Sequence, residues 1–241
     1  MRVAGPDAED LLQRFLSNDV TQGDVVAALL LTPKGRLIAP LRAWRRGPDD
    51  FLLLTEPGLG EAVRLTLVRG RFSAKCEIEA EEHTSTLVFG DAEGIPSELP
   101  GAVEVLDSKL EPTLGADELE RIRIEAGIPA WGKELDDTIL PAEAGLDETH
   151  VSFTKGCYPG QEPVARLHHR GHANRGLRVL AFDGAEVPGA GVEVLHEGRP
   201  VGRVTSAARG REGIVALAYV RAEVPLDAAL TVGSAAASQL H

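Results

Sequence analysis

Residues 153–169 read FTKGCYPGQEPVARLHH and place Cys157, one of only two cysteines in the chain, in a setting that favours a reactive thiol. Glycines and a proline on both sides of the cysteine predict a tight turn, which is typical of a surface or cleft rather than a sheet. Lys155 lies two residues earlier, and a helix is predicted to begin near Pro159. A nearby cation and a helix N-terminus both favour thiolate over thiol. An exposed cysteine without a role is the alternative.

The segment that follows, PVARLHHRGHANRGLR at 163–178, carries four arginines and three histidines and no acidic residue. In a chain with a formal net charge of −12, such a segment predicts a focused positive site for an anionic ligand, a carboxylate or a phosphate. The alternative is a solvated basic helix and loop that balances acids elsewhere. Direct nucleic-acid binding is not expected, because phosphate contacts over a whole surface need many clustered cations.

Composition sets the broad class of the protein. The chain has 241 residues, of which 43% are hydrophobic and 26% charged, as in an ordinary soluble globular protein. The longest apolar run, VVAALLL at 25–31, is far shorter than the roughly 20 residues of a membrane span, and the first residues have no signal-peptide core. We therefore expect a cytoplasmic protein without membrane contact. Two widely separated cysteines make no disulfide framework.

Upstream of the cysteine, hydrophobic periodicity and turn residues predict mixed helices and strands. Asp7 is the expected N-cap of the first helix, and a later helix is expected to stop at Gly127 and Pro129. The predicted helices cover 7–16, 57–69 and 115–127, and the predicted strands cover 25–32, 36–44, 51–55, 84–90 and 103–108.

Residues 71–80 alternate between apolar and polar side chains, which predicts a strand with one buried face. Cys76 lies on that face and is expected to be a core residue. The other residues expected on the same face are Phe72, Ala74, Ile78 and Ala80. From Leu177 onward the chain changes to short strands separated by turns, which predicts a small β-barrel or sandwich with a boundary near residue 173.

No stable metal site is predicted. Iron-sulfur clusters usually need four thiolates, and zinc sites need four close ligands. The second cysteine is expected in a distant buried strand. His168, His169 and His172 follow Cys157, but their spacing matches no zinc pattern.

Glu125 is a second candidate site residue. If Leu119, Ile122 and Ala126 face the core, Glu125 lies at the edge of the apolar face and is partly buried. A buried carboxylate needs hydrogen-bond donors, and a ligand with adjacent N–H groups would satisfy both oxygens. The alternative is an ion pair with Arg121 or Arg123.

The octapeptide KGCYPGQE, from Lys155 to Glu162, resembles the signature of the YgfZ family. These proteins are folate-binding relatives of the glycine cleavage T-protein that support iron-sulfur proteins. FLSNDVTQGD at 15–24, the hairpin LLTPKGRLIAPL and the segments between 123 and 146 also resemble family segments, in family order. Residues 45–110 and the terminal barrel match only loosely.

The resemblance implies an α+β, T-protein-like fold around a central pit. Residues 1–172 would form a folate-binding module of two α/β subdomains, the second inserted near 43–106, and residues 173–241 a C-terminal β-barrel. It further implies that Glu125 grips the pterin ring of tetrahydrofolate or another reduced folate, because a carboxylate can pair with adjacent donors. Asn18, Arg166 and Arg175 are expected as further folate contacts. Cys157 is the expected functional thiol, within the motif residues Lys155, Gly156, Tyr158, Gly160, Gln161 and Glu162.

One departure separates the chain from aminomethyl-transferring T-proteins. These carry an acidic residue in the second hairpin strand, whereas RLIAPLRAW has none, and general acid–base help needs a carboxylate within reach. We therefore expect a reduced-folate-binding factor that supports iron-sulfur cluster assembly or repair in client enzymes, including tRNA-modifying ones. The expected partners are the folate and iron-sulfur client or assembly proteins. Two alternatives stay open: a folate-dependent aminomethyltransferase or demethylase, and an interaction scaffold that binds no folate.

Overall fold

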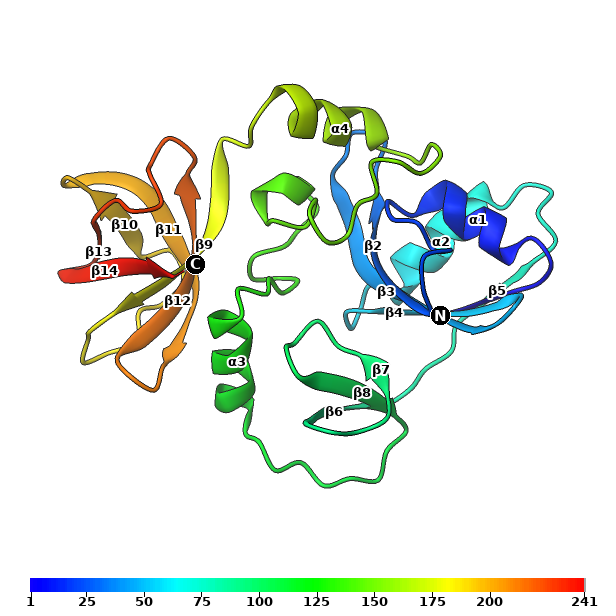
Figure 1. Ribbon diagram of the computed structural model, residues 1–241, viewed down its shortest axis with the longest axis horizontal. Coiled ribbons are helices and arrows are strands. Elements are labelled where there is room, and N and C mark those ends of the chain that lie inside the picture. The colour runs from blue at the N-terminus through cyan, green and yellow to red at the C-terminus, as the bar shows by residue number, and fades with distance from the viewer. Residues whose placement is uncertain (241) are drawn as a thin grey trace.

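The computed structural model describes residues 1–240 of the chain. Figure 1 shows three bodies: a five-stranded sheet with helices on one face, a small three-stranded sheet, and a C-terminal barrel. The helix α4 (Gln161–Arg170) spans the top of the view between the first sheet and the barrel. Among the described residues, no helix has the length and apolar composition needed to cross a membrane.

The first sheet has the strand order β2-β3-β4-β1-β5 and is antiparallel throughout. Its strands are β1 (Arg2–Ala4), β2 (Val25–Leu31), β3 (Leu37–Gly47), β4 (Asp50–Thr55) and β5 (Glu77–Glu79). The predicted hairpin and the strand after it are confirmed. Both predicted helices are confirmed as α1 (Ala8–Phe15) and α2 (Gly60–Gly70), and they cover one face of this sheet.

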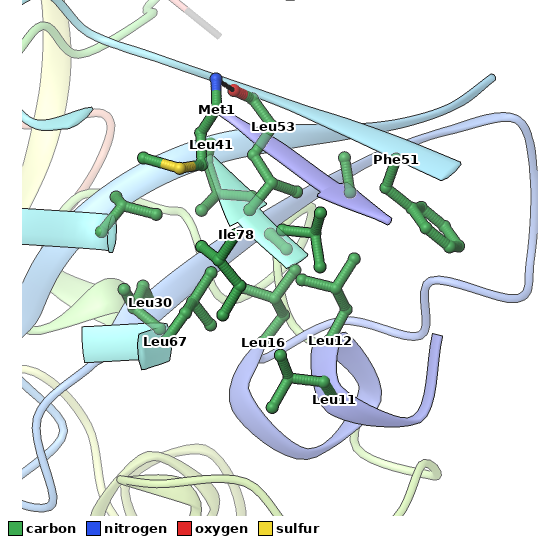
Figure 2. Close-up of a cluster of buried hydrophobic side chains, with 14 of the residues drawn as sticks. Met1, Leu11, Leu12, Leu16, Leu30, Leu41, Phe51, Leu53, Leu67 and Ile78 are labelled. Carbon is green, nitrogen blue, oxygen red and sulfur yellow. Dashed lines mark hydrogen bonds between the residues drawn. The ribbon is translucent and has the colours of Figure 1, made fainter. Parts of the chain in front are cut away.

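In the core between this face and the two helices, leucine is the most frequent residue (Figure 2). Leu11 and Leu12 of α1 and Leu67 of α2 are fully buried, and Leu30 and Leu53 of the sheet meet them. Burying each such side chain contributes about 1.5–3 kcal/mol. This core fixes the position of α1 against the sheet.

The opposite face of the first sheet, here called the inner face, points toward the rest of the molecule. Since side chains alternate along a strand, Ala28 and Leu30 join the helix-covered core while Leu29 lies on the inner face. The strand register places Pro40 opposite Leu29, and Arg42 opposite Ala27 and Leu54. The inner face packs against residues 131–164 and Tyr219 of the barrel.

The predicted strand over 71–80 is wrong for most of its length. β5 is limited to Glu77–Glu79, because its partner β1 has only three residues. Phe72, predicted to be buried, is 85% exposed in a left-handed turn with φ of 46°. Cys76 is buried, as predicted.

The small sheet contains β6 (Ser85–Phe89), β7 (Ile95–Pro96) and β8 (Ala102–Leu106) in the order β6-β8-β7. It is narrower than the inserted subdomain expected near 43–106, because β4 and β5 pair with β1 in the first sheet.

The barrel closes in the order β10-β11-β12-β9-β14-β13, which leaves no free sheet edge. Its strands are β9 (Arg175–Phe182), β10 (Glu193–His196), β11 (Arg199–Arg209), β12 (Ile214–Arg221), β13 (Leu230–Val232) and β14 (Ala235–Leu240). The helix α3 (Ala116–Glu125) packs against β11 and β12, where Ile124 meets Val215 and Leu217. The predicted small barrel is confirmed.

Candidate functional site

Cys157 is exposed on the turn that leads into α4. Gly160 ends this turn in the left-handed region with φ of +84°, and a Cβ atom there would lie 2.5 Å from the carbonyl oxygen of Thr32. The backbone is thus pressed against the hairpin turn between β2 and β3, which only glycine allows. Gly156 is exposed beside the cysteine. The thiol makes no hydrogen bond to any residue between 1 and 240.

Lys155, predicted as the cation beside the thiol, directs its ammonium group elsewhere. Nζ donates hydrogen bonds of 2.6 Å to the carbonyl oxygens of Gln13 and Leu16 at the end of α1. Burial lowers the pKa of Lys155 to about 8, and the charge of Asp19 opposes this shift. The lysine therefore binds the cysteine loop to α1.

Two motifs that are distant in sequence dock against each other beside this lysine. The hydroxyl of Ser17 donates to the carbonyl oxygen of His150 at 2.6 Å, and the Ser152 N–H donates to the carbonyl oxygen of Ser17 at 3.0 Å. The Asn18 amide donates to the carbonyl oxygens of Ala27 and Thr149. Asn18, predicted as a folate contact, thus uses its side-chain donors to join β2 to the segment before Cys157.

Cys157 and Gly156 line a cleft of about 580 Å³ on the α1 side of the molecule. The other residues that line it are Asp7, Asp10, Gln13, Arg14, Ser73 and Ala74. Asp7 is the N-cap residue of α1, as predicted, but its carboxylate accepts from the Lys75 backbone N–H at 2.7 Å rather than capping the helix. The thiol therefore faces a polar cleft next to α1.

The neighbouring motif residues point in other directions. Tyr158 is only 6% exposed and packs with Leu29 and Leu31 in the hydrophobic cluster on the inner face, here called the inner-face cluster. Its hydroxyl has no hydrogen-bond partner among the described residues, and burial raises its pKa to about 12. Gln161 and Glu162 begin α4, where a negative charge is favourable.

Glu125 ends α3 and forms an ion pair with Arg121, the partner named by the simpler alternative. The expected apolar face of this helix is wrong, because Ile124 is fully buried whereas Ala126 is exposed. The helix does stop at Gly127, which has φ of +72°. Glu125 lies on the helix that packs against the barrel, so the structure does not bring it into the Cys157 cleft.

The two predicted folate arginines occupy different surroundings. Arg166 is exposed on α4, together with three further basic residues, His168, His169 and Arg170. Arg175, at the start of β9, pairs with Glu143 at 3.1 Å and lies 4.5 Å from the ring centroid of Tyr219. The basic segment therefore does not converge on one point.

Sequence reasoning missed a group of charged residues beside the inner face, here called the inner charged cluster: Arg42, Glu56, Glu98, Glu104 and His150. Arg42 donates to Glu104 and to the Pro96 carbonyl oxygen, and His150 Nε2 lies 3.1 Å from Glu98 Oε1. These residues come from separate segments of the chain, so no sequence spacing predicts that they lie together. One available signal was Arg42, the one charge among the first eight residues of β3, LIAPLRAW at 37–44.

The pKa values of two acids in this cluster, Glu56 and Glu98, shift in opposite directions. The pKa of Glu56 is raised, first by burial and then by the negative charge of Glu98. Burial acts on Glu98 in the same sense, but the His150 hydrogen bond and the charges of His150 and Arg42 outweigh it and lower its pKa. Neighbouring carboxyl groups whose pKa values are pushed apart can serve as an acid and a base. Among residues 1–240, no three His, Cys, Asp or Glu side chains are grouped to hold a metal ion.

Known proteins resemble the chain over its whole length. It is 30% identical to the tRNA-modifying protein YgfZ of Edwardsiella ictaluri, covering 100% of this chain and 87% of that protein. The chain belongs to the YgfZ family. Another YgfZ, from an Enterobacter species, is 27% identical over 90% of the chain and 81% of its own length. A family model described as the CAF17 C-terminal beta-barrel domain matches residues 174–239.

The fold of this YgfZ-family protein also matches a solved structure. The glycine cleavage system aminomethyltransferase T from Bartonella henselae superposes with a TM-score of 0.83 at 20% identity, covering 100% of this chain and 81% of that one. The predicted family and the T-protein-like fold are therefore confirmed.

The strand β3 contains no acidic residue. A carboxylate follows directly after the next strand, β4. Thr55, the last residue of β4, donates its hydroxyl to the Pro40 carbonyl oxygen at 2.9 Å, and Glu56 follows directly. An acidic group thus lies next to the inner face although the hairpin strand has none.

Proposed function

We propose that this YgfZ-family protein is a reduced-folate-binding factor that supports iron-sulfur cluster assembly or repair in client enzymes, tRNA-modifying ones among them. Cys157 is its functional thiol. The observation that carries this proposal is the contrast between the two cysteines: Cys157 is exposed on an anchored turn, whereas Cys76 is buried and burial raises its pKa. The curated relatives named tRNA-modifying protein support the client class.

An exposed thiol on a fixed turn suits a transient reaction with a partner. A thiol that must meet a cluster or a sulfur atom on another protein has to be accessible, and reactive cysteines are partially exposed for this reason. Cys157 lines an open cleft, so a partner can approach it from solvent. Cys76 meets none of these requirements and serves the core.

The residues at the inner face fit a reduced folate. A pterin ring presents an amino group and ring N–H donors, which a carboxylate can accept. Glu56 forms no ion pair or hydrogen bond with any other side chain in residues 1–240, and Glu98 keeps 36% of its side chain exposed. Glu125 stays the predicted pterin contact from the family resemblance. Glu56 and Glu98 are the further carboxylates that this structure adds to that prediction.

Calorimetric titration with tetrahydrofolate and 5-formyltetrahydrofolate tests the folate part. We expect saturable binding by the wild type. Loss of binding in Glu125→Ala would support the predicted contact, whereas loss in Glu98→Gln alone would place the pterin at the inner charged cluster. No binding by the wild type would reject folate and favour the scaffold alternative.

The thiol part is tested in the native host. Under oxidative stress, Cys157→Ala is expected to lower the activities of iron-sulfur enzymes, while Cys76→Ala, with its thiol in the core, should act only through stability. Unchanged iron-sulfur enzyme activities in Cys157→Ala would overturn the proposed role of this thiol.

A folate-dependent one-carbon enzyme is the second candidate, favoured by one observation. Glu56 directly follows β4, whose last residue Thr55 bonds to the Pro40 carbonyl oxygen of the hairpin strand, so an acid stands beside the hairpin that lacks one. Burial and the negative charge of Glu98 raise the pKa of Glu56, as an acid needs. Turnover of tetrahydrofolate with glycine-derived or methylated amines, abolished in Glu56→Gln, would establish this activity. Absence of turnover with folate bound would leave the iron-sulfur role in first place.

A further inference from the structure

Lys155 ends in a half-buried position that the proposed thiol and folate chemistry does not use. Its two acceptors, the carbonyl oxygens of Gln13 and Leu16, belong to the last turn and C-cap of α1. The last four carbonyl oxygens of a helix have no partner within it, and a cation there also complements the helix dipole. Lys155 thus caps α1 from a point 139 residues beyond Leu16.

Lys155 contacts the cysteine loop on both sides of Cys157, through its ammonium group on one side and its backbone N–H on the other. Nζ lies 5.5 Å from the ring centroid of Tyr158, which is itself fixed in the inner-face cluster. On the other side, the Lys155 N–H donates to Ser152 Oγ at 3.3 Å, and the Ser152 N–H donates to the Ser17 carbonyl oxygen. Residues 155 and 158 are therefore both tied down, and Cys157 lies between them.

The α1 side of this contact is also a wall of the thiol cleft. Gln13, whose carbonyl oxygen accepts from Lys155, lines the cleft together with Cys157. The Gln13 side chain is fixed in turn, because it donates to Asp19 at 2.6 Å and accepts from the Val20 N–H at 3.1 Å. One lysine thus joins the two sides of the cleft.

We propose that Lys155 is the positioning residue of the thiol site: it joins the Cys157 loop to the C-terminus of α1 and so fixes the thiol across the cleft from Gln13. It acts through these bonds and not as a cation paired with sulfur. The functional meaning of this inference rests on the proposed role of Cys157, but the contact itself can be tested separately.

The experiment attaches a nitroxide spin label to Cys157 in the full chain, with Cys76→Ser present so that one thiol remains. Lys155→Met keeps the length of the side chain but removes all donors. We expect this change to shorten the rotational correlation time of the label by at least about threefold, because the loop loses its tie. Lys155→Arg keeps donors and should restore most of the order.

Lys75→Met is the matched control. Lys75 is exposed next to the cleft residue Ala74, and its ammonium group makes no hydrogen bond or ion pair with any described residue. This variant also removes one lysine charge, and it should leave the electron paramagnetic resonance spectrum of the Cys157 label unchanged. Equal label mobility in folded Lys155→Met and wild type would overturn the proposal, as would an equal effect of Lys75→Met.

Two further measurements separate this inference from the proposed function. If Lys155→Met does not fold, Lys155→Gln, whose shorter side chain cannot make both bonds to Gln13 and Leu16, carries the test: faster label motion in the folded variant supports the contact, and wild-type label motion overturns it. In the native host, Lys155→Met should lower iron-sulfur enzyme activity as Cys157→Ala does. If Cys157→Ala has no effect while the label still responds to Lys155, the proposed function fails and the positioning contact stands.

Discussion

The barrel and the small sheet are both antiparallel β-structures, but different contacts attach them to the rest of the chain. The barrel is fixed by a buried polar network around Glu134, which is only 2% exposed. Its carboxylate accepts from Arg123 at 2.8 Å and from Ser206 of β11 at 2.6 Å, and Tyr219 of β12 donates to its backbone carbonyl oxygen. Ile124 adds apolar contact beside this network.

The small sheet lacks such an attachment. None of its described residues belongs to the hydrophobic clusters that include the first sheet or the barrel. The contacts described above between Arg42 and Glu104 and between His150 and Glu98 hold it instead. Regions with few buried apolar contacts open at low free energy. We therefore expect the barrel to stay attached, and the small sheet to detach locally from the first sheet at a lower free energy.

The largest expected effect comes from the buried network. Glu134→Ala should lower the free energy of unfolding by about 3 kcal/mol, because Ser206 and the Ala130 N–H lose a buried acceptor and Arg123 keeps only its ion pair with Glu120. Urea denaturation measures this change. Glu118→Ala, on the exposed side of α3, is the control and should change stability little. Equal losses in the two variants would contradict the view that the buried network around Glu134 fixes the barrel.

A smaller, local effect is expected at the small sheet. Glu104→Gln weakens the contact with Arg42 and should cost about 1–3 kcal/mol. Hydrogen exchange should accelerate in residues 85–106 while the amides of β11 and β12 stay protected. Glu93→Gln changes an exposed acid of the same sheet region and serves as the control. Uniform acceleration across the barrel would mean that both β-structures unfold together.

The His150–Glu98 contact should make the attachment of the small sheet pH-dependent. The folded state lowers the pKa of Glu98, so the stabilisation is present above the ordinary glutamate value near 4.3 and is lost as the pH falls through the folded value. Because the carboxylate is partly exposed, we expect Glu98→Gln to cost less than about 1 kcal/mol at pH 7. The difference from wild type in chemical denaturation should vanish near pH 3. A difference that persists in acid would show that the carboxylate charge is not its source.

The sequence predicted the elements whose periodicity is local. The hairpin of β2 and β3, the helices and the barrel strands each have an apolar pattern or a turn signal within a short window. Phe72 shows the limit: alternation alone predicted a strand, but β1 is too short to pair with that part of the chain. A pattern records which side chains could share a face, not whether a partner strand exists.

The candidate site was predictable only in part for the same reason. The motif around Cys157 identified an exposed turn, but the acceptors of Lys155 lie in α1 and cannot be read from spacing. The inner charged cluster likewise gathers single charges from distant segments. For Glu125, a helical pattern gave the wrong inward face, because contact with the barrel selects Ile124.

The smallest expected effect on stability concerns Glu125, an exposed ion-pair partner in α3, in comparison with the buried Glu134 that bonds to Arg123 of the same helix. Glu125→Ala removes an ion pair whose carboxylate is 34% exposed, and water can replace that contact. The melting temperature should therefore change by less than about 2 °C, in contrast to Glu134→Ala on the same helix–barrel interface. Differential scanning calorimetry with and without 5-formyltetrahydrofolate separates two roles of Glu125. An unchanged melting temperature without ligand, combined with loss of the ligand-induced increase, would support a binding role. A large drop without ligand would instead show that the end of α3 helps to hold the barrel.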